Sequence, residues 1–305
     1  MIGPLFVLGL VLLVAIWLLW QRRGGLVWRR IMVNGVRRRY LVCASDEGLE
    51  KPLLICFHGG MARTELLAER SGIAEAGWRQ GCMVIFPEAQ GGWIDSRPER
   101  GGSTRDIDFV DALLDSLLRK RQVDAERVFA IGISNGGMFV FRLASERPAR
   151  FAGLATALAS MPPSTLFPIS GPPVPIAMIF GRKDHSMWEG GALQRGVGEV
   201  ASADATRRYW LKRNNAQPVP RLQRRISAGR QIDIEDYAAR PCGARVRFVS
   251  IGDWGHRWPM WKRAPDGTPD AFNAADLIME FFSQMRLSAT DAPVAVAAGE
   301  LNASG

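Results

Sequence analysis

The segment Gly132-Ile133-Ser134-Asn135-Gly136-Gly137 carries the clearest chemical signal in the chain. It follows an apolar, strand-like run at residues 127–131 and precedes a helix-like run at residues 138–144. A serine on a sharp turn between a strand and a helix projects away from the sheet, where a base can reach its hydroxyl. Glycines two residues before and after it leave the space that the turn needs. The segment therefore predicts Ser134 as a nucleophile.

A serine hydroxyl needs a base, and the base needs an orienting acid. The chain has three histidines, His58, His185 and His256. His256 and Asp184 each lie a few residues past an apolar run, as Ser134 does, and functional loops follow the carboxyl ends of parallel strands. The order serine, aspartate, histidine is the order of α/β-hydrolase triads. We therefore predict Ser134 as nucleophile, Asp184 as acid and His256 as base.

Two other assignments remain open from the sequence. His185 could serve as the base, although neighbours on a loop rarely face each other well and His185 directly follows Asp184. Asp253 could serve as the acid, although it lies close to His256 in sequence.

His58-Gly59-Gly60 follows a buried, strand-like run and is similar to the HGG segment that supplies an oxyanion-hole N–H in such enzymes. We expect the backbone N–H of Gly60 or Met61 on this side, and that of Asn135 on the elbow side, to stabilise the negative charge that forms on the substrate oxygen. The imidazole of His58 is expected to bond loop backbone and to take no part in the chemistry.

Three tryptophans, Trp93, Trp188 and Trp258, lie on loops that follow strands. They could form an aromatic wall for an acyl or aryl group, or they could simply pack the loops. The four cysteines lack C-x-x-C spacing, so the sequence suggests no metal site, and the predicted chemistry needs no cofactor.

The elements that must position these residues alternate along the chain. Strand-like runs occur at residues 38–43, 52–57, 82–87, 127–131, 175–181 and 245–251, and helix-like runs at residues 64–76, 106–120 and 271–285. Alternating strands and helices predict an α/β fold with a mainly parallel, doubly wound sheet. Residues 190–243 are polar, with one helix-like patch near residues 205–211, and we interpret them as an excursion over the site.

The amino-terminal segment is of a different kind. Residues 2–20 carry no charge. As a helix they would span roughly 28 Å, which is close to the hydrocarbon thickness of a bilayer. A cleaved signal peptide would have a basic start and a small-residue cleavage site, which this segment lacks. We predict an uncleaved, single-pass transmembrane helix. Because the arginines follow it, charge bias favours a cytoplasmic catalytic domain.

The net charge of +9 is concentrated in two stretches of the chain. One group of arginines lies at residues 22–39, and a second basic group lies at residues 207–225. Such groups could bind an anionic partner such as lipid headgroups, or they could be solvated surface with a topology signal. Nucleic acid is not expected as a partner, because the basic runs contain no recognisable nucleic-acid module and no interleaved aromatic residues.

Several motifs together resemble one family, the esterases grouped with polyhydroxybutyrate depolymerases and feruloyl esterases. They are Cys56-Phe57-His58-Gly59-Gly60, Val123-Asp124-Ala125-Glu126-Arg127-Val128, the elbow through Met138, Phe180-Gly181-Arg182-Lys183-Asp184, and Gly255-His256-Arg257-Trp258-Pro259. The resemblance covers about residues 38–285. It implies an α/β-hydrolase fold with Ser134, Asp184 and His256 as the triad. It also implies hydrolysis of carboxylic esters through an acyl-enzyme, without a cofactor.

The chain departs from the family pattern at three places. Asp253-Trp254 interrupts a glycine-rich run, Met260 stands where a glycine is usual, and Cys242 lacks the cysteine that commonly pairs with it. Family members are mostly secreted, which favours a periplasmic or secreted protein, against the charge bias.

The sequence thus predicts a transmembrane anchor at residues 2–20, a basic tether at 21–35, a catalytic domain at 36–286 and a disordered tail at 287–305. The predicted function is a serine esterase acting on small or oligomeric esters, of the polyhydroxyalkanoate type or with aryl or acyl groups. Two alternatives are a peptidase of the prolyl-oligopeptidase kind and a catalytically silent, membrane-tethered binding protein. The first normally needs an acidic pair for a substrate amine and a large companion domain, neither of which is visible.

Overall fold

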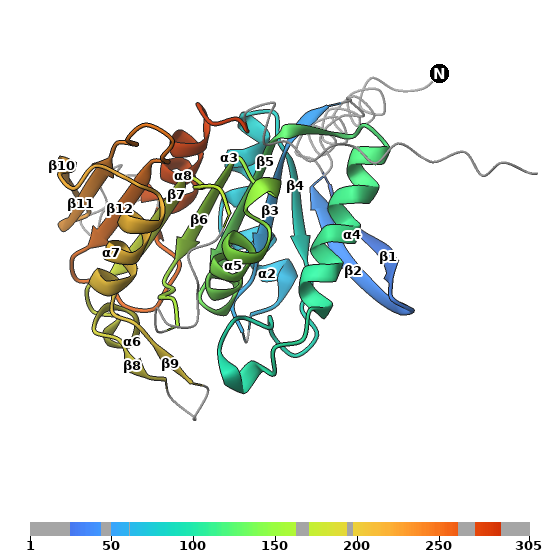
Figure 1. Cartoon of the computed structure of the whole chain (residues 1–305), viewed down its shortest axis with the longest axis horizontal. Coiled ribbons are helices and arrows are strands. Elements are labelled where there is room, and N and C mark those ends of the chain that lie inside the picture. Colours follow the sequence, from blue (N-terminus) through green and yellow to red (C-terminus); the bar gives the residue numbers. More distant parts are fainter. Residues whose placement is uncertain are drawn as a thin grey trace, which may run out of the picture.

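A ten-stranded sheet forms the centre of the computed structural model, which describes residues 25–43, 50–60, 62–162, 171–193, 198–261 and 272–287 (Figure 1). The strand order is β1-β2-β4-β3-β5-β6-β7-β12-β11-β10. The central strands are parallel: β4 (Met83–Pro87), β3 (Lys51–Phe57), β5 (Val123–Ile133), β6 (Gly153–Ala157), β7 (Ile176–Gly181) and β12 (Val246–Ile251). This confirms the predicted α/β class with a mainly parallel sheet.

Helices cover both faces of the sheet, which is why the central strands are continuous apolar runs. One face packs against α4 (Arg105–Arg119), α5 (Asn135–Glu146), the short α6 (His185–Trp188) and α7 (Ala203–Arg213). The other packs against α2 (Thr64–Arg70), α3 (Ile73–Arg79) and α8 (Ala274–Phe282) (Figure 1). The remaining short elements are η1 (Pro98–Arg100), η2 (Pro148–Arg150), β8 (Gly191–Ala192), β9 (Glu199–Val200), β13 (Met260–Trp261) and β14 (Phe272–Asn273).

The strand order reverses between β3 and β5. From β3 the chain passes through α2 and α3 to β4 on one side, and it returns through α4 to β5 on the other side. Loops that leave the carboxyl ends of strands at such a switch point diverge and leave room for a ligand. The HGG segment follows β3 and the serine elbow follows β5, so the predicted site lies at this switch point.

The helix predicted at residues 64–76 is two helices, α2 and α3. Gly72 adopts a left-handed φ of 72° between them, and the hydroxyl of Ser71 accepts a hydrogen bond from the N–H of Ile73. The left-handed φ favours glycine at this break, and an added Cβ would also lie 2.2 Å from Nδ2 of Asn273, the N-cap residue of α8.

Each edge of the sheet is an antiparallel hairpin that the sequence pattern did not predict. At one edge β1 (Leu26–Val33) pairs with β2 (Val36–Cys43), so residues 26–33 of the predicted tether are part of the sheet. At the other edge β10 (Arg221–Ser227) pairs with β11 (Arg230–Tyr237), and β11 pairs with β12. The segment 190–243 therefore extends the sheet as well as forming a surface excursion. The outer strand β10 is largely exposed and mostly polar, whereas β1 is mostly apolar apart from Arg29 and Arg30 and is exposed at alternate stretches only.

No helix within the residues described above is long and apolar enough to cross a membrane. The predicted anchor at residues 2–20 lies outside those residues, as does the predicted tail at 287–305 except for Leu287, whose N–H donates to the carbonyl of Glu126.

Candidate active site

Ser134 lies on a sharp turn between the end of β5 and the first residue of α5. Its backbone has φ 54° and ψ −122°. Such a conformation costs a residue with a side chain on the order of 1–3 kcal/mol. The Ser134 N–H donates to the carbonyl of Ala157 at 2.9 Å, and its carbonyl accepts from Met138 at 3.0 Å. These bonds hold the strained turn in place. The hydroxyl therefore lies at the carboxyl end of the central strands, as the motif predicts.

The elbow glycines are required by close backbone approaches. A Cβ on Gly132 would lie 2.2 Å from the carbonyl oxygen of Gly136, and a Cβ on Gly136 would lie 2.3 Å from that of Phe57. Gly137 leaves room for Ala159, whose Cβ would be 2.6 Å from an added Cβ. The turn therefore packs directly against the end of β3, which brings the HGG segment next to the serine.

His256 bridges Ser134 and Asp184. In the tautomer with the proton on Nδ1, that N–H donates to Asp184 Oδ2 at 2.6 Å, and Nε2 accepts from the Ser134 hydroxyl at 2.9 Å. Asp184 follows β7, its side chain is only 4 % exposed, and the His256 side chain is 44 % exposed. A buried acid, an oriented imidazole and an accessible serine are thus joined from the carboxyl ends of three strands.

The two competing residues are engaged elsewhere. His185 Nδ1 contacts Glu189 Oε1 at 2.8 Å on the exposed surface of α6. Asp253 forms an exposed ion pair with Lys183, which lowers the pKa of the Asp253 carboxyl. Among the described contacts, neither His185 nor Asp253 bonds Ser134, whereas His256 does and Asp184 bonds His256.

The predicted oxyanion hole lies where the HGG segment meets the serine elbow. Asn135 is the first residue of α5, so its N–H has no carbonyl partner one turn earlier in the helix. A Cβ on Gly60 would lie 3.4 Å from the Asn135 Cβ, so the HGG segment and the elbow are in contact at this point. Met61 lies outside the described residues.

His58 is buried behind these loops and bonds backbone on both sides, as predicted. The N–H of Ala89 donates to His58 Nε2 at 3.1 Å. The ring proton therefore lies on Nδ1, which donates to the carbonyl of Gly59 at 2.7 Å. Burial lowers the pKa of this imidazole, which favours the neutral form. His58 therefore fixes the HGG loop.

The structure contradicts the prediction that Trp93 lines a substrate wall. Trp93 is completely buried, its ring stacks on Phe139 with centroids 5.1 Å apart, and its indole N–H donates to the carbonyl of His58 at 2.9 Å. The reason is that the loop after β4 folds back into the core between β3 and α5, so an aromatic residue there fills interior space.

The other two predicted tryptophans are partly exposed. Trp188 ends α6 and packs near Phe248, with ring centroids 6.4 Å apart. Trp258 lies two residues after His256, and its indole N–H donates to the carbonyl of Ser71 at 2.8 Å.

Asp95 and Arg97 belong to the site, although no sequence motif marks them. The side-chain amide of Asn135 donates to Asp95 Oδ2 at 2.7 Å and accepts from the N–H of Trp93 at 2.8 Å. Arg97 in turn pairs with Asp95, and both side chains are almost fully buried. This network fixes the Asn135 side chain. It was missed because Asp95 lies 40 residues from Asn135 and only the fold brings the two together.

The cysteines contribute no ligand set. Cys43, Cys56 and Cys82 are buried, and burial raises the pKa of Cys82 to about 11, whereas Cys242 is exposed. Over the ranges the structure covers, no group of three or more His, Cys, Asp or Glu side chains is placed to hold a metal ion.

No protein-family model matches the chain. The chain is 30 % identical over 257 residues to a protein named "Putative esterase NocK" from Nocardia uniformis subsp. tsuyamanensis, in a match that covers 76 % of this chain and 73 % of that relative. An acetyl xylan esterase from Aspergillus awamori superposes with a TM-score of 0.58 at 14 % identity, over 84 % of this chain and 99 % of that chain. A thermostable esterase gives a TM-score of 0.53 at 11 % identity, over 87 % of this chain and 64 % of that one.

The two solved structures share the fold, and the Nocardia relative is similar over most of both chains. The chain therefore belongs to the α/β-hydrolase esterases, and it is a carboxylic ester hydrolase.

Proposed function

We propose that Ser134, His256 and Asp184 form the catalytic triad and that ester hydrolysis proceeds through an acyl-enzyme on Ser134. The observation that carries this proposal is the position of His256, with Nε2 2.9 Å from the serine oxygen and Nδ1 2.6 Å from the Asp184 carboxylate. The distances are those that a general base and its orienting acid need before the reaction begins.

In the first half-reaction the Ser134 oxygen attacks the ester carbonyl while His256 Nε2 takes the serine proton. The backbone N–H of Asn135, with that of Gly60 or Met61, stabilises the resulting oxyanion, and such donors contribute about 2.7–4 kcal/mol each to transition-state stabilisation. The tetrahedral intermediate then collapses. The bond to the alcohol oxygen breaks, and the imidazolium of His256 returns its proton to the leaving alcohol.

In the second half-reaction water replaces the alcohol. His256 takes a proton from the water, whose oxygen attacks the acyl carbon, and the Ser134–acyl bond breaks as the serine recovers the proton. The products are a carboxylic acid and a free enzyme. Asp184 holds the imidazole in its tautomer and stabilises the transient imidazolium.

The proposed substrates are esters of hydroxyalkanoate oligomers or of aryl and short acyl groups. Support comes from the motif resemblance to polyhydroxybutyrate depolymerases and feruloyl esterases and from the partly exposed rings of Trp188 and Trp258, each close in sequence to a triad residue. A panel of p-nitrophenyl esters, hydroxybutyrate oligomers, methyl ferulate and peptide amides tests this. Activity on the amides alone would rule out the ester assignment for this site.

The triad itself is tested by labelling with a fluorophosphonate, which reacts with activated serines. We expect wild type and the matched control Ser283→Ala, at the exposed end of α8, to label strongly, and Ser134→Ala to remain unlabelled. Equal labelling of Ser134→Ala and wild type would overturn the proposed nucleophile.

We also propose that residues 2–20 anchor the enzyme in a membrane, with the catalytic domain in the cytoplasm. The support is the uncharged, apolar sequence of this segment and the arginines that follow it. Cys242 is the suitable reporter, because it is exposed whereas Cys43 is buried. An impermeant maleimide should label Cys242 only after the cells are permeabilised. Labelling in intact cells, absent in Cys242→Ser, would place the domain on the outer side.

A further inference from the structure

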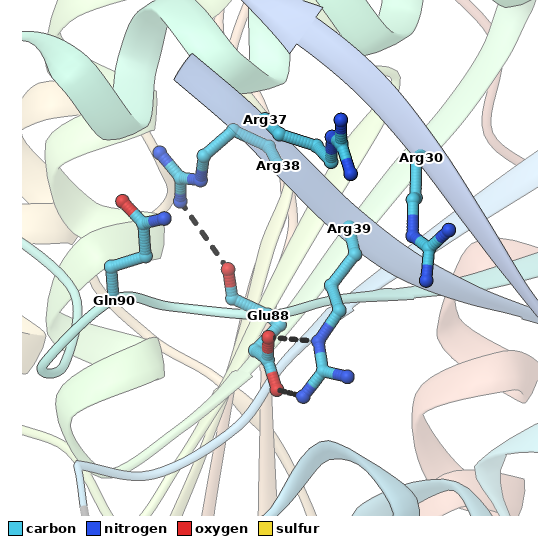
Figure 2. Close-up of a pocket in the computed structure, with 6 residues that line it drawn as sticks. All are labelled: Arg30, Arg37, Arg38, Arg39, Glu88 and Gln90. Carbon is cyan, nitrogen blue, oxygen red and sulfur yellow. Dashed lines mark hydrogen bonds and ion pairs between the residues drawn. The ribbon is translucent and has the colours of Figure 1, made fainter.

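The β1–β2 hairpin and the loop after β4 border an open pocket of about 270 Å³ that the esterase chemistry does not use (Figure 2). Four arginines, one glutamate and one glutamine line it: Arg30, Arg37, Arg38, Arg39, Glu88 and Gln90. We propose that this arginine pocket binds a phosphate group, carried either by an anionic phospholipid or by a soluble phosphate compound.

Strand register concentrates three of the four charges on one face of the hairpin. Arg30 lies directly opposite Arg39, and Arg37 lies two residues before Arg39, so these side chains share a face because alternate residues along a strand do. Like charges directly opposite each other destabilise a hairpin. The repulsion between Arg30 and Arg39 therefore costs stability unless an anion offsets it, and Glu88 does so only at Arg39.

Two of the four guanidinium groups already have carboxylate partners. Arg38 is buried and pairs with Asp106 at 2.9 Å, and Arg39 forms a bidentate pair with Glu88. Arg30 and Arg37 are exposed, and neither forms an ion pair with any acidic residue in the described part of the chain. Figure 2 shows Glu88 linked to Arg38 and Arg39, whereas Arg30 and Arg37 are linked to none of the residues drawn.

The hairpin at the opposite edge of the sheet shows how arginines are arranged where the fold neutralises them. There Arg224 pairs with Asp233 at 2.7 Å, and Arg221 lies opposite Asp236 in the register of β10 and β11. Arg225 of the same strand lies opposite Ile232 and, within the described residues, bonds only Gln223, so the fold neutralises part of the charge of that hairpin. The arginine pocket differs in that four arginines converge on one cavity whose described lining holds a single carboxylate, that of Glu88.

The lining suits a phosphate group. Guanidinium groups match the geometry of phosphate oxygens and bind them in a bidentate way, and a concave site concentrates the positive potential. The Gln90 side chain adds an uncharged amide donor. No aromatic residue is among the described residues that line the pocket, so it lacks the stacking platform that a nucleic-acid base needs.

Thermal unfolding of the full chain in neutral detergent micelles tests the proposal, since a ligand that binds the folded state raises the unfolding midpoint. One arm adds inorganic phosphate in place of chloride at constant ionic strength. The other compares micelles doped with phosphatidylglycerol and with phosphatidylcholine. We expect a rise in at least one arm, and the apparent affinity should fall about tenfold or more in Arg30→Gln/Arg37→Gln, which loses two charge-assisted donors.

The charge-matched control is Arg221→Gln/Arg225→Gln on exposed positions of β10, which should respond as wild type does. Arg30→Lys/Arg37→Lys keeps the charge and loses the bidentate geometry, so an intermediate affinity is expected, and circular dichroism checks that each variant folds. A higher unfolding midpoint with inorganic phosphate would show that the pocket binds a soluble phosphate. A higher midpoint with phosphatidylglycerol alone would show that it binds the lipid headgroup. No response in either arm, or an equal response in the pocket and control variants, would overturn the proposal.

Discussion

The surroundings of Ser134 and the arginine pocket differ in how completely their charges are matched. Near the serine, His256 contacts Asp184, and Asp95 joins Arg97 to the side chain of Asn135. In the arginine pocket, the one lining carboxylate, Glu88, pairs with Arg39, and Arg30 and Arg37 form no ion pair within the described residues. Closed networks hold groups in one geometry, which catalysis requires. Uncompensated cations leave binding energy for a ligand, at a cost in stability.

The largest expected effect is at the base. His256→Ala should lower kcat by about 10⁶-fold, because without the imidazole the serine keeps its proton. His185→Ala is the matched control, since His185 contacts Glu189 on the surface of α6, and its kcat should remain that of wild type. Steady-state hydrolysis of a p-nitrophenyl ester measures both. Comparable losses in the two variants would contradict the assignment of the base.

A smaller loss is expected at the acid. Asp184→Asn should lower kcat by about 10⁴-fold, because an amide cannot hold the required tautomer or stabilise the imidazolium. Asp253→Asn removes only the exposed pair with Lys183, so its turnover should not change. If Asp253→Asn were the more damaging substitution in the same assay, Asp253 would be the acid.

The network around Asn135 should matter next. Asn135→Ala retains the backbone N–H but releases the loop after β4 and Asp95. We therefore expect kcat to fall about 10- to 100-fold with little change in KM. Asn273→Ala, which removes the N-cap of α8, should lower stability by about 1 kcal/mol and leave kcat unchanged. A parallel change in KM and kcat for Asn135→Ala would indicate a binding role instead.

His58 predicts a pH dependence of stability. Burial depresses the pKa of the folded-state imidazole. Below the unfolded pKa of about 6.5, the unfolded chain therefore binds a proton that the folded chain does not. The contribution of His58 to the free energy of unfolding is therefore fully present above about pH 6.5, and it is lost as the pH falls toward the folded-state pKa. The free energy of unfolding, measured with urea at several pH values between about 5 and 7.5, should change more steeply with pH in wild type than in His58→Gln. The expected difference is up to about 1.4 kcal/mol per pH unit. Equal slopes would argue against a neutral, buried His58.

The smallest effect tests the cost of the uncompensated charge. Arg30→Gln removes a like charge opposite Arg39, so unfolding at low ionic strength without phosphate should show a gain of about 0.2–1 kcal/mol that salt abolishes. Arg224→Gln in the opposite hairpin breaks a pair with the nearly buried Asp233 and should lower stability. A loss of stability in Arg30→Gln would mean that Arg30 is held by the fold.

Features set by neighbouring residues were predictable from the sequence. The elbow around Ser134 needs specific glycines at fixed spacing, and the apolar period of residues 106–120 predicts the buried side of α4. Strand ends were visible because a buried parallel strand is a continuous apolar run. These signals placed the elbow, the HGG segment and the fold class, since each depends on residues that are close in the sequence.

Tertiary contacts decided the rest. Ser134 and His256 are 122 residues apart, and which histidine meets the serine depends on how β5, β7 and β12 are ordered in the sheet. The interior position of Trp93 is likewise set by packing between strands and helices that are distant in the chain.

The same division holds at the edges of the sheet. The arginines of residues 22–39 are visible in the sequence. The pairing of β1 with β2 decides that Arg30 lies opposite Arg39. The loop after β4 then supplies the Glu88 carboxylate to Arg39 and not to Arg30. The sequence by itself determined the nucleophile turn and the α/β class, because local spacing encodes both. Only the tertiary structure decided which charges are matched, because a charge is matched by whatever the fold brings next to it.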